Sequence, residues 1–202
     1  MSEHSVSPDL TGAKSKRALI LDAAVRVIGR DGVAHGVKSA VVAKEAGVSV
    51  GLVHYHFATL EERARQEFLY ADAITIRAMA EAAGTAESGR HEIALRLMPW
   101  LEDTREFQQA WEVWGEFWHA SRHDDEVRAL LHDAWDEWVQ LIAEAIERGR
   151  VDGSIPQSVR PVETARRLAA LLESLGQQLT LGLITGEDAR GLLLGATARE
   201  FP

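Results

Sequence analysis

Three consecutive side chains, His54, Tyr55 and His56, place hydrogen-bond donors at the end of a short apolar segment. Imidazole and phenol groups can donate to phosphate oxygens and to the edges of bases. The segment that contains them reads VVAKEA over residues 41–46, Gly-Val-Ser over 47–49 and VGLVHYH over 50–56. Two short helices joined by a tight glycine-containing turn are typical of a helix-turn-helix, whose second helix can lie in a DNA major groove. The spacing therefore predicts a DNA-reading helix.

Other residues of this segment are also candidates for DNA contact. Lys38 and Ser39 stand at the beginning of the first short helix, where backbone N–H groups favour phosphate. Ser49 is the expected N-cap of the second helix, a role that can coexist with a phosphate contact. Gly51 permits close backbone approach to DNA or serves turn packing, and Leu52 could touch a thymine methyl group. The predicted DNA-binding set is Lys38, Ser39, Ser49, Gly51, Leu52, His54, Tyr55 and His56.

All six tryptophans lie between positions 100 and 138. Helical spacing places those of residues 103–123 on one narrow stripe with Phe107, and two more follow one turn apart on the next predicted helix. Flat, bulky indole rings can wall a cavity or fill a core, and both readings stay open. A cavity would suit a flat apolar molecule, or a quaternary ammonium through cation–π attraction of about 0.5–2 kcal/mol per ring. Its predicted lining is Trp100, Trp111, Trp114, Trp118, Trp135 and Trp138.

Two histidines, His119 and His123, lie four residues apart and could chelate a metal ion with Glu112 or Glu116. A solvated polar face explains them better, so we expect no metal ion and no cofactor. The chain has no Cys, no Ser motif with a plausible His and acid partner, and no phosphate-binding Gly loop. The sequence therefore predicts that the protein is not an enzyme.

The elements that must position these residues are helical. Apolar residues recur at helical spacing and strand-like alternation is absent, which predicts an all-α fold of about nine helices. A capping-box pattern at Thr59 predicts a long helix toward Gly84, while Val53 and Phe57 are assigned to the core. The expected organisation is a flexible N-terminal tail over 1–13, a helix-turn-helix domain over 14–58 and a larger helical domain over 59–202.

Composition limits the cellular setting. The absence of Cys suits a reducing cytosol, and no apolar run approaches the ~20 residues that span a bilayer. We therefore expect a cytoplasmic protein without a membrane partner. The net charge of −9 is unevenly distributed: residues 1–60 carry seven Lys and Arg against five Asp and Glu, which leaves −11 for the rest. Salt screens charges beyond about 8–10 Å, so the acidic remainder does not exclude DNA binding.

Residues 16–70 resemble the DNA-binding segment of the tetracycline-repressor (TetR) family of bacterial regulators. The matching stretches are RALILDAA from Arg17, Gly32-Val33, VAKEAGVS from Val42, Gly51 and HYHF from His54. The resemblance implies that the His and Tyr side chains contact phosphates and bases. Two departures lower the expected charge contacts: Val50 replaces a commonly polar or basic residue, and Leu60 replaces a common Lys.

The rest of the chain resembles the branch of that family containing choline-sensing repressors, through its W-x2-FW pattern and helical layout. This resemblance implies a small-molecule effector between the central helices and a homodimer formed by the final helix pair. Two-fold symmetry then predicts a palindromic double-stranded DNA operator. The final apolar stripe could serve the dimer interface or the core of one protomer. The predicted interface residues are Leu172, Leu175, Leu179 and Leu183.

Together these observations predict a one-component transcriptional regulator. The expected mechanism is a repressor released from its operator by an unidentified small-molecule effector, with the long helix from Thr59 acting as a rigid lever. The alternative is a dimeric small-molecule-binding protein with little or no specific DNA binding. The departures at Val50 and Leu60 keep that alternative open.

Overall fold

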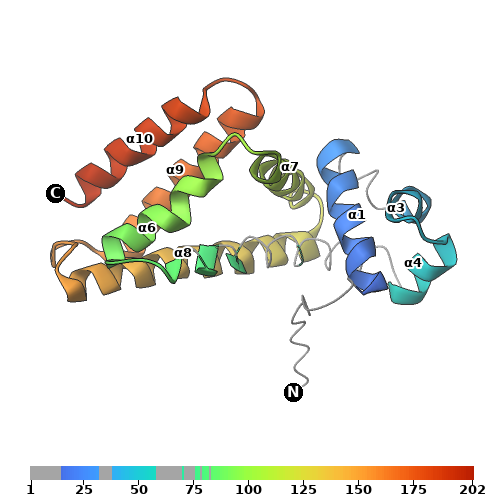
Figure 1. Ribbon diagram of the computed structural model, residues 1–202, viewed down its shortest axis with the longest axis horizontal. Helices are drawn as coiled ribbons and strands as arrows, with labels where there is room; N and C mark the ends of the chain where they lie inside the picture. Colours follow the sequence, from blue (N-terminus) through green and yellow to red (C-terminus); the bar gives the residue numbers. More distant parts are fainter. Residues whose placement is uncertain (1–14, 32–37, 58–69, 71–75, 78, 82) are drawn as a thin grey trace, which may run out of the picture. The chain divides into compact units, whose positions relative to one another are not determined.

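The structure, a computed structural model, describes the parts of the chain that carry most of the predicted sites. The described residues are 15–31, 38–57, 70, 76, 77, 79–81 and 83–202. They form eight α-helices and one 3-10 helix, and no strand occurs among them (Figure 1). The predicted all-α fold is therefore confirmed. The chain divides into two compact units, residues 1–70 and 71–202.

Some predictions fall outside the described residues. These are the flexible tail over 1–13, the domain boundary after residue 58, and most of the long helix expected from Thr59, including Leu60. Among the described residues, none of the helices combines the length and the apolarity that a membrane crossing requires.

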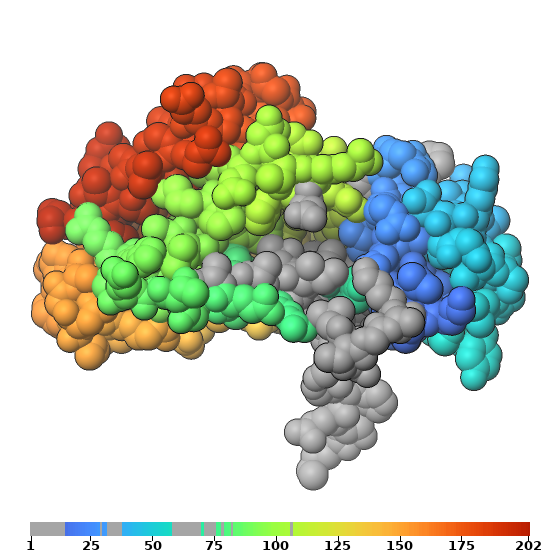
Figure 2. Space-filling view, viewed as in Figure 1, coloured from blue at the N-terminus to red at the C-terminus, as the bar shows by residue number. Residues whose placement is uncertain are grey.

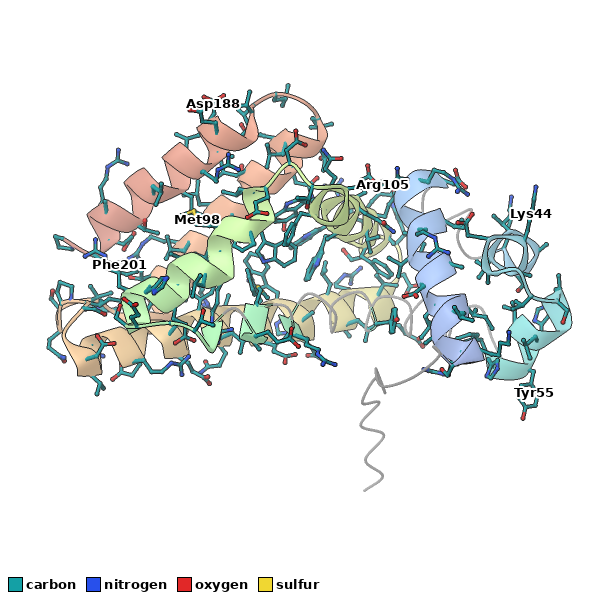
Figure 3. The ribbon with its side chains drawn as sticks, in the orientation of Figure 1. Lys44, Tyr55, Met98, Arg105, Asp188 and Phe201 are labelled. Atoms are coloured by element: carbon teal, nitrogen blue, oxygen red, sulfur yellow. The ribbon has the colours of Figure 1, made fainter. Side chains whose placement is uncertain are left out.

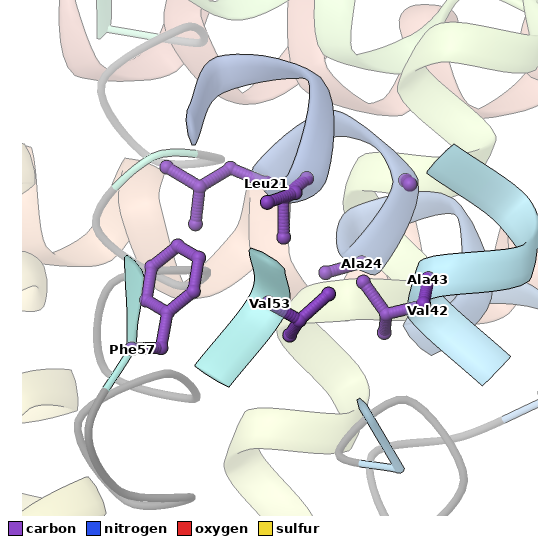
Figure 4. Close-up of a cluster of buried hydrophobic side chains, with 8 residues drawn as sticks. Leu21, Ala24, Val42, Ala43, Val53 and Phe57 are labelled. Carbon is purple, nitrogen blue, oxygen red and sulfur yellow. The ribbon is translucent and has the colours of Figure 1, made fainter. Parts of the chain in front are cut away.

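The smaller unit contains three described helices, α1 (Lys16–Asp31), α3 (Ser39–Ala46) and α4 (Val50–His56). Their apolar faces meet in one cluster of buried side chains (Figure 4). Small alanines on α1 and α3 let the helices approach closely, while each larger side chain contributes about 1.5–3 kcal/mol by burial. The cluster consists of Ile20, Leu21, Ala23, Ala24, Val42, Ala43, Val53 and Phe57.

The turn between α3 and α4 is set by two residues. Gly47 adopts a left-handed conformation with φ of 66°, and its N–H donates back to the carbonyls of the last turn of α3. A residue with a Cβ would be strained there. Ser49 then caps α4, because its side-chain oxygen accepts a hydrogen bond from the N–H of Leu52 at 3.2 Å. Local chemistry thus fixes how α4 leaves α3.

The larger unit is built around a long helix. Its elements are α6 (Gly89–Leu97), the 3-10 helix η1 (Met98–Leu101), α7 (Arg105–Ala120), α8 (Asp125–Asp152), α9 (Pro161–Thr180) and α10 (Gly186–Glu200). Helix α8 packs against α6 and α9, and α9 also packs against α7 and α10. In the space-filling view α10, in red, lies along the upper edge of this unit (Figure 2).

Residue Pro99 follows the end of α6 and belongs to the next, shorter helix. Helix α6 ends at Leu97, and Pro99 lies in the first turn of η1. The ring fixes φ near −65° and the missing N–H is not needed in a first turn, so proline suits this place. The consequence is that η1 carries Trp100 into the interior, where 5% of its surface is exposed.

An ion-pair network ties α6 to α8. The carboxylate of Glu92 accepts hydrogen bonds from Arg96, one turn away on α6, and from two nitrogens of Arg148 on α8 at 2.6 and 2.7 Å. Burial by itself would raise the pKa of Glu92, but the two guanidinium groups outweigh it and hold that pKa below its usual range. The network therefore fixes the helix that carries η1.

Candidate functional site

The exposed face of α4 is formed by Val50, Gly51, His54 and Tyr55, while Val53 faces the core. Residues spaced by four along a helix lie on the same side, so these four positions share one surface. Tyr55 is 82% exposed, the largest value among the exposed apolar and aromatic side chains together with Val151. Figure 3 shows Tyr55 pointing away from the unit. The helix therefore presents donors on its open side.

Two of the predicted DNA contacts are partly used in packing. Leu52 is half-buried against the apolar cluster. His56 is also half-buried, and its ring meets that of Tyr55 edge-on with 5.2 Å between centroids. His54 and Tyr55 are therefore the more accessible donors, and His56 packs against the tyrosine ring.

Charges around the two short helices are distributed unevenly. Lys38, at the N-terminus of α3, is exposed. Hydrogen bonds from Arg26 and Arg30 on α1 hold the pKa of Glu45 below its usual range, so this acid is neutralised within the unit. In Figure 3 Lys44 projects from α3 in the direction opposite to Tyr55. Lys38 therefore remains a candidate phosphate contact, whereas Lys44 faces elsewhere.

In the larger unit, the tryptophans converge on a cavity. Five of the six line it, together with Ile76, Met79, Ala169 and Glu173. The rings pack at angles: Trp100 lies 5.1 Å from Trp111 and 5.6 Å from Trp138 between centroids. Tilted aromatic contacts at this distance are favourable. The five tryptophans are Trp100, Trp111, Trp114, Trp135 and Trp138.

The sixth tryptophan has a different place. Trp118 is 40% exposed and does not belong to the lining, which corrects its assignment to the pocket. Its ring meets that of Trp135 edge-on with 6.0 Å between centroids. It also donates a hydrogen bond to the carboxylate of Glu173. Trp118 therefore holds a lining residue in place from outside the cavity.

Glu173 is the acidic residue of this lining, and the sequence pattern did not identify it. Its side chain accepts a hydrogen bond from Nε2 of Gln177 at 3.2 Å. Burial raises the pKa of Glu173, and the hydrogen bonds from Gln177 and Trp118 partly oppose that rise. Its spacing of four from Ala169 on α9 was the available signal, because it puts a carboxylate on the cavity face of an apolar helix.

The predicted interface leucines separate into two groups. Leu172 and Leu175 are each 1% exposed and lie in the core of their own protomer, which does not fit the predicted interface role. Leu179 is half-buried and Leu183 is 67% exposed. The other large apolar side chains exposed around the last two helices are Val162, Leu181, Leu192 and Leu194.

The described residues include no group of three His, Cys, Asp or Glu side chains that could share a metal ion. The rings of His119 and His123 do lie near each other, 6.2 Å between centroids, and both are exposed.

A helix-turn-helix with exposed donors, carried on the same chain as a helical unit with an aromatic cavity, defines a one-component DNA-binding regulator. Residues 90–202 match the family described as BetI-type transcriptional repressor, C-terminal, and residues 20–62 match the bacterial regulatory proteins of the tetR family. The chain belongs to the TetR family of transcriptional regulators, with a C-terminal part of the BetI type. Such regulators bind operator DNA and small-molecule effectors and function as dimers.

Solved structures agree with this assignment. A Rhodococcus sp. protein grouped with TetR-family regulators is 29% identical, with a TM-score of 0.84 over 93% of this chain and 98% of its own. A regulator from Saccharomonospora viridis, crystallised with choline, is 28% identical, with a TM-score of 0.77 over 89% and 93% of the two chains. One from Streptomyces coelicolor is 26% identical, with a TM-score of 0.68 over 92% and 98%. Among curated proteins, none matches the sequence.

Proposed function

We propose that this regulator represses transcription by reading a palindromic operator with α4, and that His54 and Tyr55 supply its main contacts. The observation that carries the proposal is the exposed donor face of α4, held by a capped helix-turn-helix. Lys38 and Ser39 at the start of α3 add phosphate contacts, and Ser49 and Gly51 let the backbone approach. The protein acts in the cytoplasm and without catalytic turnover.

The effector we propose is a small quaternary ammonium compound. Five indole rings surround the cavity, and the carboxylate of Glu173 supplies a negative charge beside them. Ring faces attract a cation that has lost its water, and a quaternary ammonium has no N–H that would need a hydrogen-bond partner. The Saccharomonospora viridis regulator was crystallised with choline, which supports the same ligand class here.

Release from DNA requires a difference in affinity between two states. The effector shifts the equilibrium only as far as it binds the non-operator state more tightly. Trp100 lies on η1, which directly follows α6. A cation that displaces the ring of Trp100 therefore acts on α6, which is joined to α8 by the ion pair between Glu92 and Arg148.

The dimer surface we propose is the exposed side of the final helices, which keeps Leu183 from the predicted interface but not Leu172 and Leu175. Leu181, Leu183, Leu192 and Leu194 are each more than half exposed. Exposed apolar side chains commonly mark an interface, and a two-fold axis would bury the matching side chains of both copies. The apolar stripe through Leu172 then stabilises the protomer itself.

The test is fluorescence anisotropy with DNA from upstream of the protein's own gene, at about 150 mM salt. The double variant His54→Ala/Tyr55→Ala should weaken binding by about 30-fold or more, since each lost contact to DNA is worth ~1–3 kcal/mol and two contacts are removed. The matched control is His123→Ala/His132→Ala, which removes two exposed side chains of the larger unit.

Equal loss in both double variants would contradict the proposed role of α4. Selection of binding sites from random genomic DNA identifies an operator that lies elsewhere. Binding that is weak, unselective and abolished by moderate salt would instead favour a ligand-binding protein without specific DNA recognition.

A further inference from the structure

Two cavities of the larger unit share one side chain. The tryptophan-lined cavity has a volume of about 20 Å³, and a second cavity of about 270 Å³ lies beside it. The second, which we call the outer chamber, is lined by Glu102 and Asp103 before α7, by Thr180 at the end of α9, and by Thr185 and Gly186 at the start of α10. Among the described lining residues, Trp111 is the one that belongs to both cavities.

The smaller cavity is too small for the proposed effector. A water molecule already needs roughly 10–15 Å³ by this measure, so the cavity has room for about one. A trimethylammonium group has several times the volume of a water molecule. A cation can therefore enter only if at least one lining side chain moves.

Trp111 is held by one hydrogen bond and by ring packing. Its indole N–H donates one hydrogen bond to the carbonyl oxygen of Trp100, at 2.8 Å. One face of the ring lies directly on α9 at Gly176, where an added Cβ would overlap the ring. The ring is therefore fixed by this hydrogen bond and by packing, and its displacement requires the hydrogen bond to break. A displaced ring would join the cavity to the outer chamber.

The outer chamber also suits the arrival of a cation. Glu102 and Asp103 are exposed carboxylates at its wall, and α7 to α10 lie in a part of the chain with net negative charge. A wall of one charge sign raises the local concentration of the opposite charge. None of the described lining residues of the chamber is a buried charged residue.

We propose that Trp111 is the gate between these two spaces and that the effector reaches the tryptophan cavity through the outer chamber. The inference rests on the proposed effector site, but the gate can be tested without any effector. The other tryptophans of the cavity do not line the outer chamber. Gln108, on the same helix as Trp111, lines the outer chamber but not the tryptophan cavity, and provides a matched control.

The experiment uses the absence of Cys from the chain. Ala169→Cys places a single thiol in the lining of the tryptophan cavity, at a position that is fully buried. Its modification rate is measured with methyl methanethiosulfonate, which is neutral, and with the trimethylammonioethyl reagent, which carries a quaternary ammonium. Each rate is compared in the Ala169→Cys protein, with added Trp111→Ala, and with added Gln108→Ala.

Removing the gate should accelerate labelling by both reagents about tenfold or more, because access no longer waits for an opening step. Gln108→Ala widens the outer chamber but leaves Trp111 in place, and should keep the rate within about threefold of the parent. Equal acceleration by the two variants, or no acceleration by Trp111→Ala, overturns the gate. Far-UV circular dichroism checks folding. If Trp111→Ala does not fold, Trp111→Phe takes its place, because it loses the hydrogen bond but keeps a ring. No acceleration of labelling in that variant would again refute the gate.

Equilibrium titration of the unmodified protein with tetramethylammonium separates the two proposals. If tetramethylammonium does not bind but labelling still depends on Trp111, the proposed effector class is wrong and the proposed access route stands. Binding with labelling that does not depend on Trp111 supports the effector class and refutes the gate.

Discussion

The change Glu92→Gln should destabilise the larger unit strongly although it alters few atoms. Glu92 and Arg96 are 9% and 8% exposed at their side chains, and Glu92 also pairs with the half-exposed Arg148. One nitrogen of Arg96 is buried without a hydrogen-bond partner, so Glu92 is the main compensation for this buried charge. An amide cannot replace it, because a neutral group leaves the guanidinium charge unpaired.

The expected cost follows from that burial. Breaking a buried ion pair by removing one partner costs about 3–5 kcal/mol. Arg148 can turn to solvent, so the lower end of the range, about 3 kcal/mol, applies here. For a chain of this length each kcal/mol lowers Tm by about 2–4 °C, which gives a decrease of roughly 6–12 °C.

The assay is thermal unfolding followed by circular dichroism, at fixed protein concentration because the dimer contributes to stability. The control is Glu200→Gln, which breaks the pair between Glu200 and Arg167, where the side chains are 24% and 55% exposed. Exposed pairs contribute about 0.2–1 kcal/mol, so Tm should fall by at most ~4 °C. Similar decreases in the two variants would refute the reasoning.

Two further measurements examine the cause. The double variant Glu92→Gln/Arg96→Met removes the stranded charge and should recover part of the lost stability. The pKa of Glu92 is lowered in the folded state, so its stabilisation is present above the unfolded carboxyl pKa of about 4.3 and is lost as pH falls through the folded value. The difference between wild type and Glu92→Gln should therefore persist at neutral pH and shrink only in acid.

Three other predictions concern the cavity and the reading helix. Gly176→Ala should lower the free energy of unfolding by about 1–3 kcal/mol, because the new Cβ overlaps the ring of Trp111. In the control Gly195→Ala, the new Cβ meets no neighbouring atom within the protomer. Equal effects of the two changes on thermal unfolding would show that the overlap is relieved without cost. Glu173→Gln should weaken tetramethylammonium binding about tenfold. Burial raises the pKa of Glu173, so wild-type affinity should fall as pH drops toward that raised value, and calorimetry between pH 8 and pH 5 should find no such fall in the variant. Ser49→Ala should cost about 1 kcal/mol in the smaller unit through loss of the cap, and unchanged urea unfolding would contradict the capping role.

The helix-turn-helix was readable from sequence because its determinants are local. Apolar spacing placed Val53 and Phe57 in the core, and both are buried. The turn depends on one left-handed glycine, Gly47, and one cap, Ser49, which act on neighbours within a few residues. Such signals do not require knowledge of distant contacts. Which donors contact DNA stays a prediction.

The cavity was readable only in part. Helical periodicity put Trp111, Trp114 and Trp118 on one stripe, and the first two line the cavity. Trp118 lies outside it because periodicity gives the direction of a side chain but not how far the facing helices extend. Glu173 was missed for a related reason: the rings beside it come from other helices, and its partner Trp118 lies 55 residues earlier in the sequence.

By itself, the sequence determined the all-α class, the reading helix and the concentration of tryptophans, since each depends on residue type and short spacing. Only the tertiary structure decided which apolar surface each helix buries. Leu172 and Leu175 carry the pattern of an interface, yet they pack inside their own protomer. An apolar stripe requires burial but does not specify its partner, because the hydrophobic effect depends on area removed from water and has no direction.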